Sequence, residues 1–317
     1  MINISYEQIN DLLKIDDLFE PVKQAFIDYN SSSLIGVPVS LLHFPNNADT
    51  HIKTAAIKGY DYFSIKVVSM FPDNAKQNLS PFSGAIFLFD GKTGFPAAIL
   101  NDKGIITDFR TAAAGAIITD FVASKSSTSV AIIGTGIQAY FQVFALAKLR
   151  RINTLAIYGR SKEKALSLKE KLTHSYPDLK VTLVDSVEKA VKESEIIITT
   201  TSSKTPLIKG KWLQKGQHIT AVGSDDIYKN EIDSDCFDYA DSIFIDSLEL
   251  NKKYGEFSHA IKSTPKLIDK TIEFGVAFQN KAFENSKNKI TVAKLVGVGI
   301  QDLAASLVVM NKLKNPN

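Results

Sequence analysis

Hydrophobic and polar positions alternate in two different ways along the chain. From Ser129 onward, short continuous apolar runs are separated by amphipathic segments. This pattern is typical of parallel strands and helices that cover both faces of one sheet. We therefore predict an α/β region with strands at Ser129–Ile133, Thr154–Tyr158, Lys180–Val184, Glu195–Thr200, His218–Val222 and Ser242–Asp246. Helices are expected after the first strand, through Lys148, and over Ser161–His174.

The first 120 residues follow a different pattern. A helix is expected over Tyr6–Tyr29, followed by strands that include Tyr62–Met70 and Gly84–Asp90, and Gly91–Pro96 is expected to be a turn. Successive strands favour a mostly antiparallel sheet and a separate α+β domain. The predicted domains are 1–120 with 290–317 and, between them, 121–289. Residues 124–129 are the expected crossing point, and 290–314 are read as a strand and a helix that return to the first domain.

Composition narrows the classes of protein. The 317 residues are 44% hydrophobic and 22% charged, with a net charge of +3 and no basic stripe, so we expect no nucleic-acid partner. The single cysteine, Cys236, cannot form an internal disulfide and has no nearby ligand partner, so no metal site is predicted. The first twenty residues do not resemble a signal peptide and no apolar run is long enough to cross a membrane, so a cytoplasmic protein is expected.

The sequence Gly134-Thr135-Gly136-Ile137-Gln138-Ala139 follows a predicted strand and precedes a predicted helix. In such a G-x-G-x-x-A turn, the first glycine permits a tight turn and the second lets the backbone approach a pyrophosphate. The third position is small so that helix and strand pack closely. The helix N-terminus then offers free N–H groups to phosphates. The segment therefore predicts a Rossmann domain that binds a nicotinamide dinucleotide.

The end of the second strand bears on the choice of cofactor. Sites for NAD usually carry an acid there for the ribose 2′-hydroxyl. This strand instead ends in Tyr158-Gly159-Arg160-Ser161, and the first acid is Glu163. A guanidinium beside a hydroxyl suits a 2′-phosphate, so NADPH is predicted, with NADH used less well. The alternative is that Arg160 stacks on the adenine of NAD.

Five segments together resemble the ornithine cyclodeaminase/mu-crystallin family over nearly the whole chain. They are Ser83–Pro96, Thr107–Ala114, Ile133–Ala139, Val222–Asp226 with Lys229 and Glu231, and Gln301–Ala305. The resemblance implies a Rossmann domain joined to a domain that binds substrate and forms a homodimer. It also implies hydride exchange at the α-carbon of an amino acid or its cyclic imine, which requires a cation for the carboxylate and an acid or base near the nitrogen.

Site residues are carried over from the family position by position. Arg110 would hold the substrate carboxylate, Lys66 would face the substrate and Asp225 would be the catalytic aspartate. The alternatives are a surface or helix-end salt bridge for Arg110, an outward-facing lysine for Lys66 and a capping or turn role for Asp225. The adjacent Asp226 is the alternative position for the catalytic aspartate. Besides Arg160, Ser161 and the six residues of the glycine turn, the cofactor contacts implied by the resemblance are Ser83, Thr111, Thr200, Thr201, Val222 and Lys229.

Two positions depart from the ornithine cyclodeaminases. Ser40 stands where they carry an arginine, and Lys53 stands where they carry a glutamate thirteen residues before the strand lysine. A glutamate suits a second amino group, so its reversal to lysine weakens the case for ornithine. Lys53 would instead serve as a second cation for a carboxylate, or it is a simple exposed lysine.

Three functions remain open. The first is NADPH-dependent reduction of Δ1-pyrroline-2-carboxylate, and of the six-membered Δ1-piperideine-2-carboxylate, to L-proline and L-pipecolate. The second is conversion of L-ornithine to L-proline and ammonia with recycled NAD. An alanine-type dehydrogenase, which acts on an open-chain amino acid, is intermediate between these two functions. The third is a non-catalytic binding protein, which the combination of Lys66, Arg110 and Asp225 disfavours.

Overall fold

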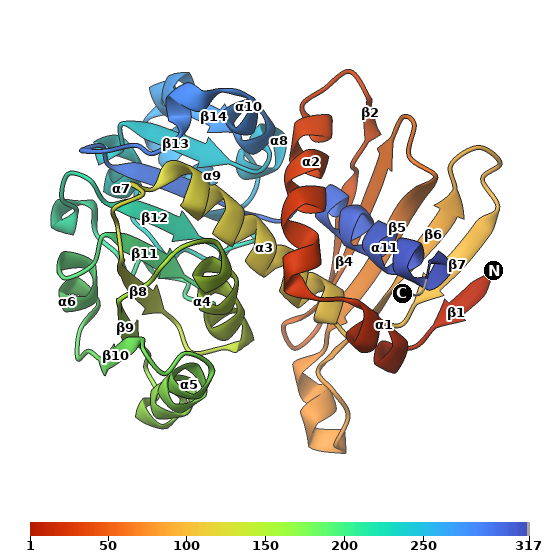
Figure 1. Cartoon of the computed structure of the whole chain (residues 1–317), viewed down its shortest axis with the longest axis horizontal. Helices are drawn as coiled ribbons and strands as arrows, with labels where there is room; N and C mark the ends of the chain where they lie inside the picture. Colours follow the sequence, from red (N-terminus) through yellow and green to blue (C-terminus); the bar gives the residue numbers. More distant parts are fainter. Residues whose placement is uncertain (316–317) are drawn as a thin grey trace. The chain divides into compact units, whose positions relative to one another are not determined.

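The chain forms two compact units, and the computed structural model describes residues 1–315 (Figure 1). The first unit contains Met1–Thr111 and the segment from Val298 onward, and the second contains Ala112–Gly297. These limits differ from the predicted boundaries at 120 and 290. One helix and one strand, described below, account for the difference.

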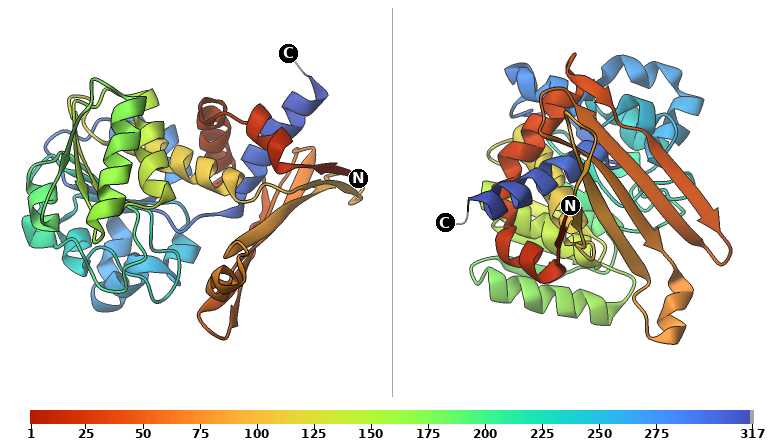
Figure 2. Two further views of the ribbon diagram at one scale, coloured as in Figure 1. Left: turned by 90° about the horizontal axis from the view of Figure 1, so that it is seen from below. Right: turned by 90° about the vertical axis from the view of Figure 1, so that its right-hand side faces the viewer.

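The first unit is built on a seven-stranded sheet with the order β1-β7-β6-β5-β4-β2, in which β3 also pairs with β4. Strands β4 to β7 are antiparallel, as predicted, and β1 joins β7 in parallel. Helices α1, α2 and α11 lie over one face of this sheet (Figure 2). The strands are β1 Ile2–Ile4, β2 Leu34–Gly36, β3 Val39–Phe44, β4 Ala48–Ile57, β5 Tyr62–Met70, β6 Phe82–Asp90 and β7 Pro96–Leu100. The helices are α1 Tyr6–Leu12, η1 Ile15–Leu18, α2 Phe19–Tyr29, η2 Pro72–Gln77 and α11 Gly299–Lys314.

The opening helical segment is broken, so the prediction of one helix over Tyr6–Tyr29 is wrong in its middle. Helix α1 begins at a capping box in which Ser5 and Gln8 exchange hydrogen bonds. Leu13 and Lys14 are extended, and the Lys14 N–H donates to the Asp17 carboxylate at 3.0 Å. This side-chain bond starts a new helical segment because it satisfies a backbone donor that the first helix would otherwise use.

The second unit contains an eight-stranded sheet in the order β10-β9-β8-β11-β12-β15-β13-β14, and every pair is parallel. Helix α5 packs against β9 and β10, and α6 packs against β8 and β9. The strands are β8 Ser129–Ile133, β9 Thr154–Tyr158, β10 Lys180–Leu183, β11 Ile196–Thr199, β12 His218–Ala221, β13 Ser242–Ile245, β14 Thr271–Glu273 and β15 Thr291–Lys294. The helices are α4 Ile137–Leu149, α5 Lys162–Ser175, α6 Val187–Lys192, η3 Gly210–Trp212, α7 Ser234–Tyr239, α8 Leu248–Asn251, α9 Gly255–Ser263, η4 Pro265–Lys270, α10 Phe274–Gln279 and η5 Lys281–Phe283. This is the α/β Rossmann architecture predicted from the sequence.

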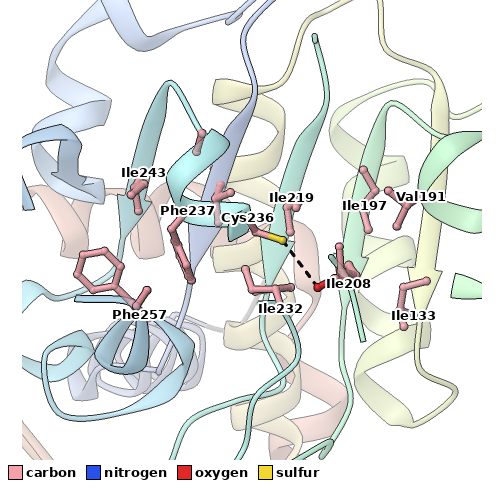
Figure 3. Packing of buried hydrophobic residues seen from close by; sticks show 14 of the residues in the cluster. Ile133, Val191, Ile197, Ile208, Ile219, Ile232, Cys236, Phe237, Ile243 and Phe257 are labelled. Atoms are coloured by element: carbon pink, nitrogen blue, oxygen red, sulfur yellow. Dashed lines mark hydrogen bonds between the residues drawn. The ribbon is translucent and has the colours of Figure 1, made fainter. Parts of the chain in front are cut away.

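The core of the second unit contains isoleucines from neighbouring strands and residues from the helices beside them (Figure 3). Phe237 and Phe257 are both fully buried and meet edge to face, with ring centroids 5.5 Å apart. Cys236 is also fully buried, and its Sγ lies 3.8 Å from the Ile208 carbonyl oxygen. Burial raises the pKa of this thiol, which is therefore a packed, unreactive group.

Helix α3, Ile105–Val122, carries the chain from the first unit into the second. The expected crossing at residues 124–129 is therefore wrong, because the helix continues past the boundary after Thr111. Gly115 allows the helix to approach Gln142 of α4, since a Cβ at Gly115 would lie 2.2 Å from the Gln142 Oε1. Further along, the Thr119 hydroxyl bonds the Thr220 hydroxyl of β12 at 2.6 Å.

Strand β15 accounts for the second boundary. It lies between β12 and β13 in the parallel sheet, so this strand does not return to the first domain as predicted. Only α11, which follows it, belongs to the first unit. Among residues 1–315, the longest apolar helical stretches fall short of what a bilayer span requires.

Candidate active site

The glycine turn has the geometry that its sequence predicts. Gly134 has φ +124°, and a Cβ there would lie 2.6 Å from the Thr200 hydroxyl oxygen, so this position requires glycine. At Gly136, the N-cap of α4, a Cβ would meet nothing within 4 Å. Ala139 is fully buried against the sheet. The turn therefore leaves open space directly before a 13-residue helix, where a pyrophosphate would meet free N–H groups.

A pocket of about 400 Å³ opens at this turn. It is formed by the carboxyl ends of β8, β9 and β11 and the loops that follow them, where open α/β sheets place their ligands. The predicted cofactor residues that line it are Gly134, Thr135, Gly136, Arg160, Ser161, Thr200 and Thr201. Seven of the predicted residues thus lie around one cavity in the second unit.

The end of β9 contributes the basic side of this pocket. Arg160 lines it, and Ser161 caps α5 by accepting the Lys164 N–H at 3.2 Å. Lys164 also lines the pocket, and sequence reasoning missed it because it lies one helical turn beyond the strand end. The lining residues, all within the described part of the chain, include no Asp or Glu. The pocket therefore offers two cations and a hydroxyl on the side where a ribose would lie.

The other predicted cofactor residues lie outside this pocket. Ile137, Gln138 and Ala139 form the first turn of α4, and Val222 and Lys229 belong to the segment after β12. Ser83 is exposed in β6, and Thr111 is the last residue of α3 within the first unit.

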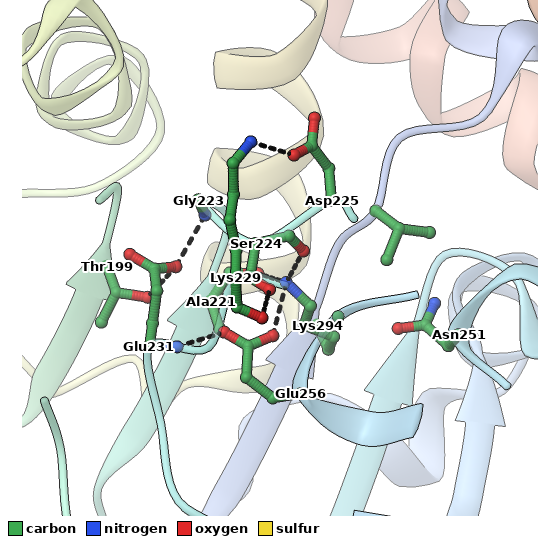
Figure 4. Close-up of polar contacts among 12 residues, drawn as sticks. Thr199, Ala221, Gly223, Ser224, Asp225, Lys229, Glu231, Asn251, Glu256 and Lys294 are labelled. Atoms are coloured by element: carbon green, nitrogen blue, oxygen red, sulfur yellow. Dashed lines mark hydrogen bonds and ion pairs between the residues drawn. The ribbon is translucent and has the colours of Figure 1, made fainter. Parts of the chain in front are cut away.

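Asp225 and Asp226 have different contacts in the loop after β12, and Figure 4 shows the pair that Asp225 forms with Lys229. The Lys229 ammonium donates to the Asp225 carboxylate at 2.6 Å and lies 3.4 Å from Asp226. Asp226 accepts the N–H groups of Tyr228 and Lys229 at 2.7 and 2.8 Å, so it stabilises the turn itself. Although burial opposes it, the two carboxylates raise the pKa of Lys229 to about 12. Asp225 is the carboxylate of this pair that is not engaged in these turn bonds.

A second charged cluster lies in the first unit. The Lys66 ammonium, on β5, donates to Asp302 of α11 at 2.9 Å and to the Thr107 hydroxyl at 2.6 Å. Arg110, on α3, donates its Nε–H to the same Asp302 oxygen at 3.0 Å. The Arg110 guanidinium also donates to the Gln301 side-chain oxygen at 2.7 Å. Lys66 is 3% exposed, Arg110 5% and Asp302 0%, so Lys66 does not face outward. Arg110 does form a salt bridge, but this salt bridge is buried and not on the surface.

Lys53 belongs to the same region. It is 7% exposed and is the cross-strand partner of Lys66, so it is not the simple exposed lysine of the alternative reading. Burial lowers the pKa of Lys66. Burial alone would raise the pKa of Asp302, but Arg110, Lys66 and Lys53 together lower it. Three cationic side chains thus act on Asp302, and a second buried acid, Asp102, also interacts with Lys66. Three cations against two acids leave an excess of positive charge for an anionic ligand.

Asp302 and Gln301 were missed as site residues, although both stand in a segment that carries the family resemblance. The available signal was a charged residue within an otherwise apolar helix, which rarely occurs without a partner. Among the described residues, none forms a hydrogen bond with Asp302 Oδ2 or Gln301 Nε2, although both atoms are buried. Within residues 1–315, no group of three or more His, Cys, Asp or Glu side chains forms a candidate metal site.

Comparison with known proteins identifies relatives over the full length. The model of the ornithine cyclodeaminase/mu-crystallin family matches residues 2–317. An uncharacterized cyclodeaminase of Sinorhizobium fredii is 35% identical over 280 residues, covering 87% of this chain and 84% of its own. The structure of Thermococcus litoralis Δ1-pyrroline-2-carboxylate reductase in complex with NADH and L-proline aligns with a TM-score of 0.88 at 28% identity, covering 99% of this chain and 98% of that one. An archaeal alanine dehydrogenase dimer with bound NAD aligns with a TM-score of 0.89 at 28% identity, covering 99% and 97%.

The sequence segments, the dinucleotide-binding fold and these full-length matches agree. The chain is an oxidoreductase, and it belongs to the ornithine cyclodeaminase/mu-crystallin family.

Proposed function

We propose that this protein reduces a cyclic ketimine acid with NADPH, converting Δ1-pyrroline-2-carboxylate to L-proline. The six-membered Δ1-piperideine-2-carboxylate, which would give L-pipecolate, is proposed as a further substrate because one methylene changes binding in an apolar pocket by only about 1–3 kcal/mol. The observation that carries the proposal is the buried cluster of Lys53, Lys66 and Arg110 around Asp302. Such a cluster suits a small anionic substrate.

Arg110 and Lys66 are proposed to hold the substrate carboxylate. The guanidinium is planar and pairs with a carboxylate through two parallel bonds, while the ammonium adds a second donor. Asp302 keeps both cations in place without neutralising the cluster, because Asp302 and the buried Asp102 contribute two negative charges at most against three positive ones. The buried Gln301 amide nitrogen adds a donor at the same place.

Asp225 is proposed as the catalytic aspartate. A carboxylate stabilises the protonated imine nitrogen before reduction and exchanges a proton with the amine afterwards. Its ion pair places the Lys229 ammonium 2.6 Å from the carboxylate, which favours the charged form that this role requires. When bound, a nicotinamide dinucleotide supplies the hydride that the imine carbon accepts.

The preference for NADPH over NADH rests on the residues of this chain, since the comparison structures contain NADH and NAD. Arg160 and Lys164 provide two cations, and Ser161 provides a hydroxyl, in a pocket whose described lining lacks an acid. A 2′-phosphate is favoured by such donors, whereas a free 2′-hydroxyl usually meets a carboxylate.

Ornithine cyclodeamination is the second candidate, because a relative 35% identical to this chain carries the name cyclodeaminase. Lys53 argues against it. The lysine is buried on the same face of the sheet as Lys66, where a second cation would repel the side-chain ammonium of ornithine. An alanine-type dehydrogenase is a further candidate through the archaeal structure. Retention of Lys66, Arg110 and Asp225 continues to disfavour a binding protein without catalysis.

A homodimer is proposed as the working form. The face of the sheet opposite the helices carries half-buried apolar residues on three consecutive strands: Ile52, Phe63, Ile65, Val67, Ala85, Phe87 and Phe89. Phe63 and Phe89 stack with ring centroids 5.1 Å apart. A second copy of this chain would cover the apolar face, and the archaeal alanine dehydrogenase is itself a dimer. Analytical ultracentrifugation tests this arrangement.

A substrate panel assayed with NADPH and NADH tests the function. We expect stoichiometric NADPH consumption with Δ1-pyrroline-2-carboxylate, whereas ammonia release from ornithine without net cofactor turnover would support the second candidate. Asp225→Asn should bind NADPH normally and lower kcat by about 10²-fold, the usual scale of acid–base assistance. Unchanged turnover in that variant would contradict the assignment of Asp225.

A further inference from the structure

Three charged side chains are fully buried beneath the loop that carries Asp225. Glu231 is 0% exposed, Glu256 1% and Lys294 0% (Figure 4). Burying charges is costly unless each is paired and hydrogen-bonded, so a cluster of this kind requires an explanation. None of the three lines the dinucleotide pocket, and none is assigned a role by the proposed reaction.

Glu231 connects the ends of two strands. One carboxylate oxygen accepts the Thr199 hydroxyl at 2.8 Å and the Gly223 N–H at 2.7 Å, and the other accepts the Thr201 N–H. Thr199 ends β11 and is followed by Thr200 and Thr201, which line the dinucleotide pocket. Gly223 follows β12 and precedes Asp225 by two residues. One carboxylate thus joins a wall of the cofactor pocket to the loop of the catalytic aspartate.

Glu256 and Lys294 support this carboxylate from behind. Glu256 accepts the backbone N–H of Glu231 at 2.9 Å, and its other oxygen lies 2.8 Å from the Lys294 ammonium. Lys294 in turn donates to the Ser224 carbonyl oxygen at 2.5 Å. Glu231 therefore binds the backbone of Gly223, and Lys294 binds the backbone of Ser224. Both contacts lie immediately before Asp225.

Two glycines make this close approach possible. A Cβ at Gly223 would lie 2.1 Å from the Thr201 carbonyl oxygen and 2.7 Å from the Glu231 carboxylate. Gly255 has φ +70°, and a Cβ there would lie 2.7 Å from the Lys294 side chain and 3.0 Å from the Ser224 carbonyl oxygen. At Gly223 and Gly255 the backbone thus packs directly against the charged side chains, which fixes where these side chains lie.

We propose that Glu231, supported by Glu256 and Lys294, is a positioning residue that sets the place of Asp225 relative to the Thr200–Thr201 wall of the cofactor pocket. The proposal rests on the proposed function, because it gives Asp225 the catalytic role. Glu231 touches neither substrate nor cofactor and acts only through the loop that it holds. A displacement of about 1 Å at a reacting group is enough to lower a rate about 10²-fold.

A double-mutant cycle tests the proposal on the full-length protein. Glu231→Gln retains the shape but replaces one acceptor with an NH₂ group, so either the Thr201 or the Gly223 N–H loses its partner. We expect kcat for the best imino acid of the panel to fall at least 10-fold, while the Kd of NADPH changes less than 3-fold, roughly the scale of one perturbed hydrogen bond. In an Asp225→Asn background, the same substitution should lower kcat less than 2-fold. Equal effects in both backgrounds, or an unchanged kcat, would overturn the proposal.

Glu195→Gln is the matched control. Glu195 lies just before β11 and accepts the Thr128 and Ser129 N–H groups at 2.9 and 3.1 Å, so it also joins two strands of this sheet, at their amino ends. We expect it to affect stability but not kcat. If Glu231→Gln fails to fold, Thr199→Val removes a single donor to the same carboxylate, and its effect on kcat should likewise disappear in the Asp225→Asn background.

The cycle also separates the two levels of inference. If Asp225→Asn alone leaves kcat unchanged, the proposed role of Asp225 is wrong and the positioning role of Glu231 fails with it. If Asp225→Asn lowers kcat but Glu231→Gln acts equally in both backgrounds, only the positioning role fails.

Discussion

The two units of this protein each bury a charged cluster, and the two clusters have opposite excess charge. In the first unit, Lys53, Lys66 and Arg110 surround Asp302. In the second unit, Glu231 and Glu256 share Lys294. Both clusters lie against strands of a sheet, and both are almost inaccessible to water.

The difference lies in what satisfies the unpaired charge. In the second unit, both oxygens of Glu231 accept bonds from backbone N–H groups or a hydroxyl. Glu256 Oε2 accepts no hydrogen bond from the described residues, but it lies 2.8 Å from the Lys294 ammonium. In the first unit, Asp302 Oδ1 accepts from two of the three cations, while the buried Asp302 Oδ2 and Gln301 Nε2 form no hydrogen bond with the described residues. A buried donor and a buried acceptor left unused at the same place are suited to receive a ligand, whereas a carboxylate with both oxygens engaged holds structure in place.

The largest expected effect comes from removing the counter-charge of the cationic cluster. Asp302→Asn removes the carboxylate that bonds both Lys66 and Arg110 and leaves Asp102 as the remaining buried acid near Lys66, which should lower the free energy of unfolding by about 3–5 kcal/mol. Urea denaturation measures this loss. Asp73→Asn, whose pair with Lys76 is exposed, serves as the control and should leave stability nearly unchanged. A similar, small loss in both variants would show that Asp302 does not organise the cluster.

The cluster of Glu231, Glu256 and Lys294 should make the free energy of unfolding depend on pH. Burial and the neighbouring Glu256 raise the pKa of Glu231 from 4.5 to about 7. The folded state then binds a proton more tightly than the unfolded state, so this group stabilises the fold below pH 4.5 and loses that contribution as pH rises to about 7. The loss is at most about 1.4 kcal/mol per pH unit. Glu231→Gln should remove this slope from the unfolding free energies measured between pH 4.5 and 7.5.

Glu195 gives the opposite expectation for the same measurement. Although burial works against it, bonds from the Thr128 and Ser129 backbone N–H groups lower its pKa. Its stabilising contribution is therefore lost as the pH falls through that lowered pKa. In Glu195→Gln, the free energy of unfolding should consequently depend less on pH in the acidic range. If the free energy of unfolding of Glu231→Gln changes with pH in the same way as that of the unmodified protein, burial does not raise the Glu231 pKa.

Exposed cations should have a smaller effect than buried ones. Arg160→Gln should raise the KM for NADPH by about 10- to 100-fold and leave that for NADH nearly unchanged, since hydrogen bonds to charged groups contribute about 1.5–3 kcal/mol. Steady-state kinetics with both cofactors measures the ratio. Lys162→Gln, at the first residue of α5 and outside the pocket lining, should leave the ratio unchanged. A retained NADPH preference in Arg160→Gln would exclude it as the 2′-phosphate ligand.

Lys53 is expected to have the smallest effect, because Lys66 and Arg110 already supply the nearest charges to Asp302. Lys53→Met should lower kcat/KM for the imino acid about 10-fold, corresponding to loss of one charge interaction of about 1.4 kcal/mol. Lys58→Met, just beyond the same strand on the exposed surface, is the control. Equal activity of the two variants would place Lys53 outside the substrate site.

Local features of the fold were predictable from the sequence. The strands Tyr62–Met70 and Thr154–Tyr158 lie where predicted, because their apolar content and flanking turns are local signals. The conformation of the turn at Gly134 was equally accessible, since a backbone with positive φ selects glycine.

Long-range partnerships were not predictable in this way. Asp302 reaches Lys66 across 236 positions of the chain and Arg110 across 192, so no periodicity or spacing indicates that they meet. The contacts of Glu231 span only 8 to 32 residues, but they too depend on how β11 and β12 lie side by side and not on a local pattern. Lys164 was missed for a different reason, since its role depends on the direction in which α5 leaves the strand.

The position of β15 affects the order in which the protein can be assembled. Its neighbours β12 and β13 are translated well before it, but they cannot be joined until Thr291–Lys294 has left the ribosome. Until then each presents an unpaired strand edge, which is prone to aggregation. The same late strand delivers Lys294, the cation that completes the buried cluster. A nascent chain that stops short of residue 291 therefore lacks both an inner strand of its sheet and the support for the Asp225 loop. The second unit can reach its native state only after this last part of the chain has been synthesised.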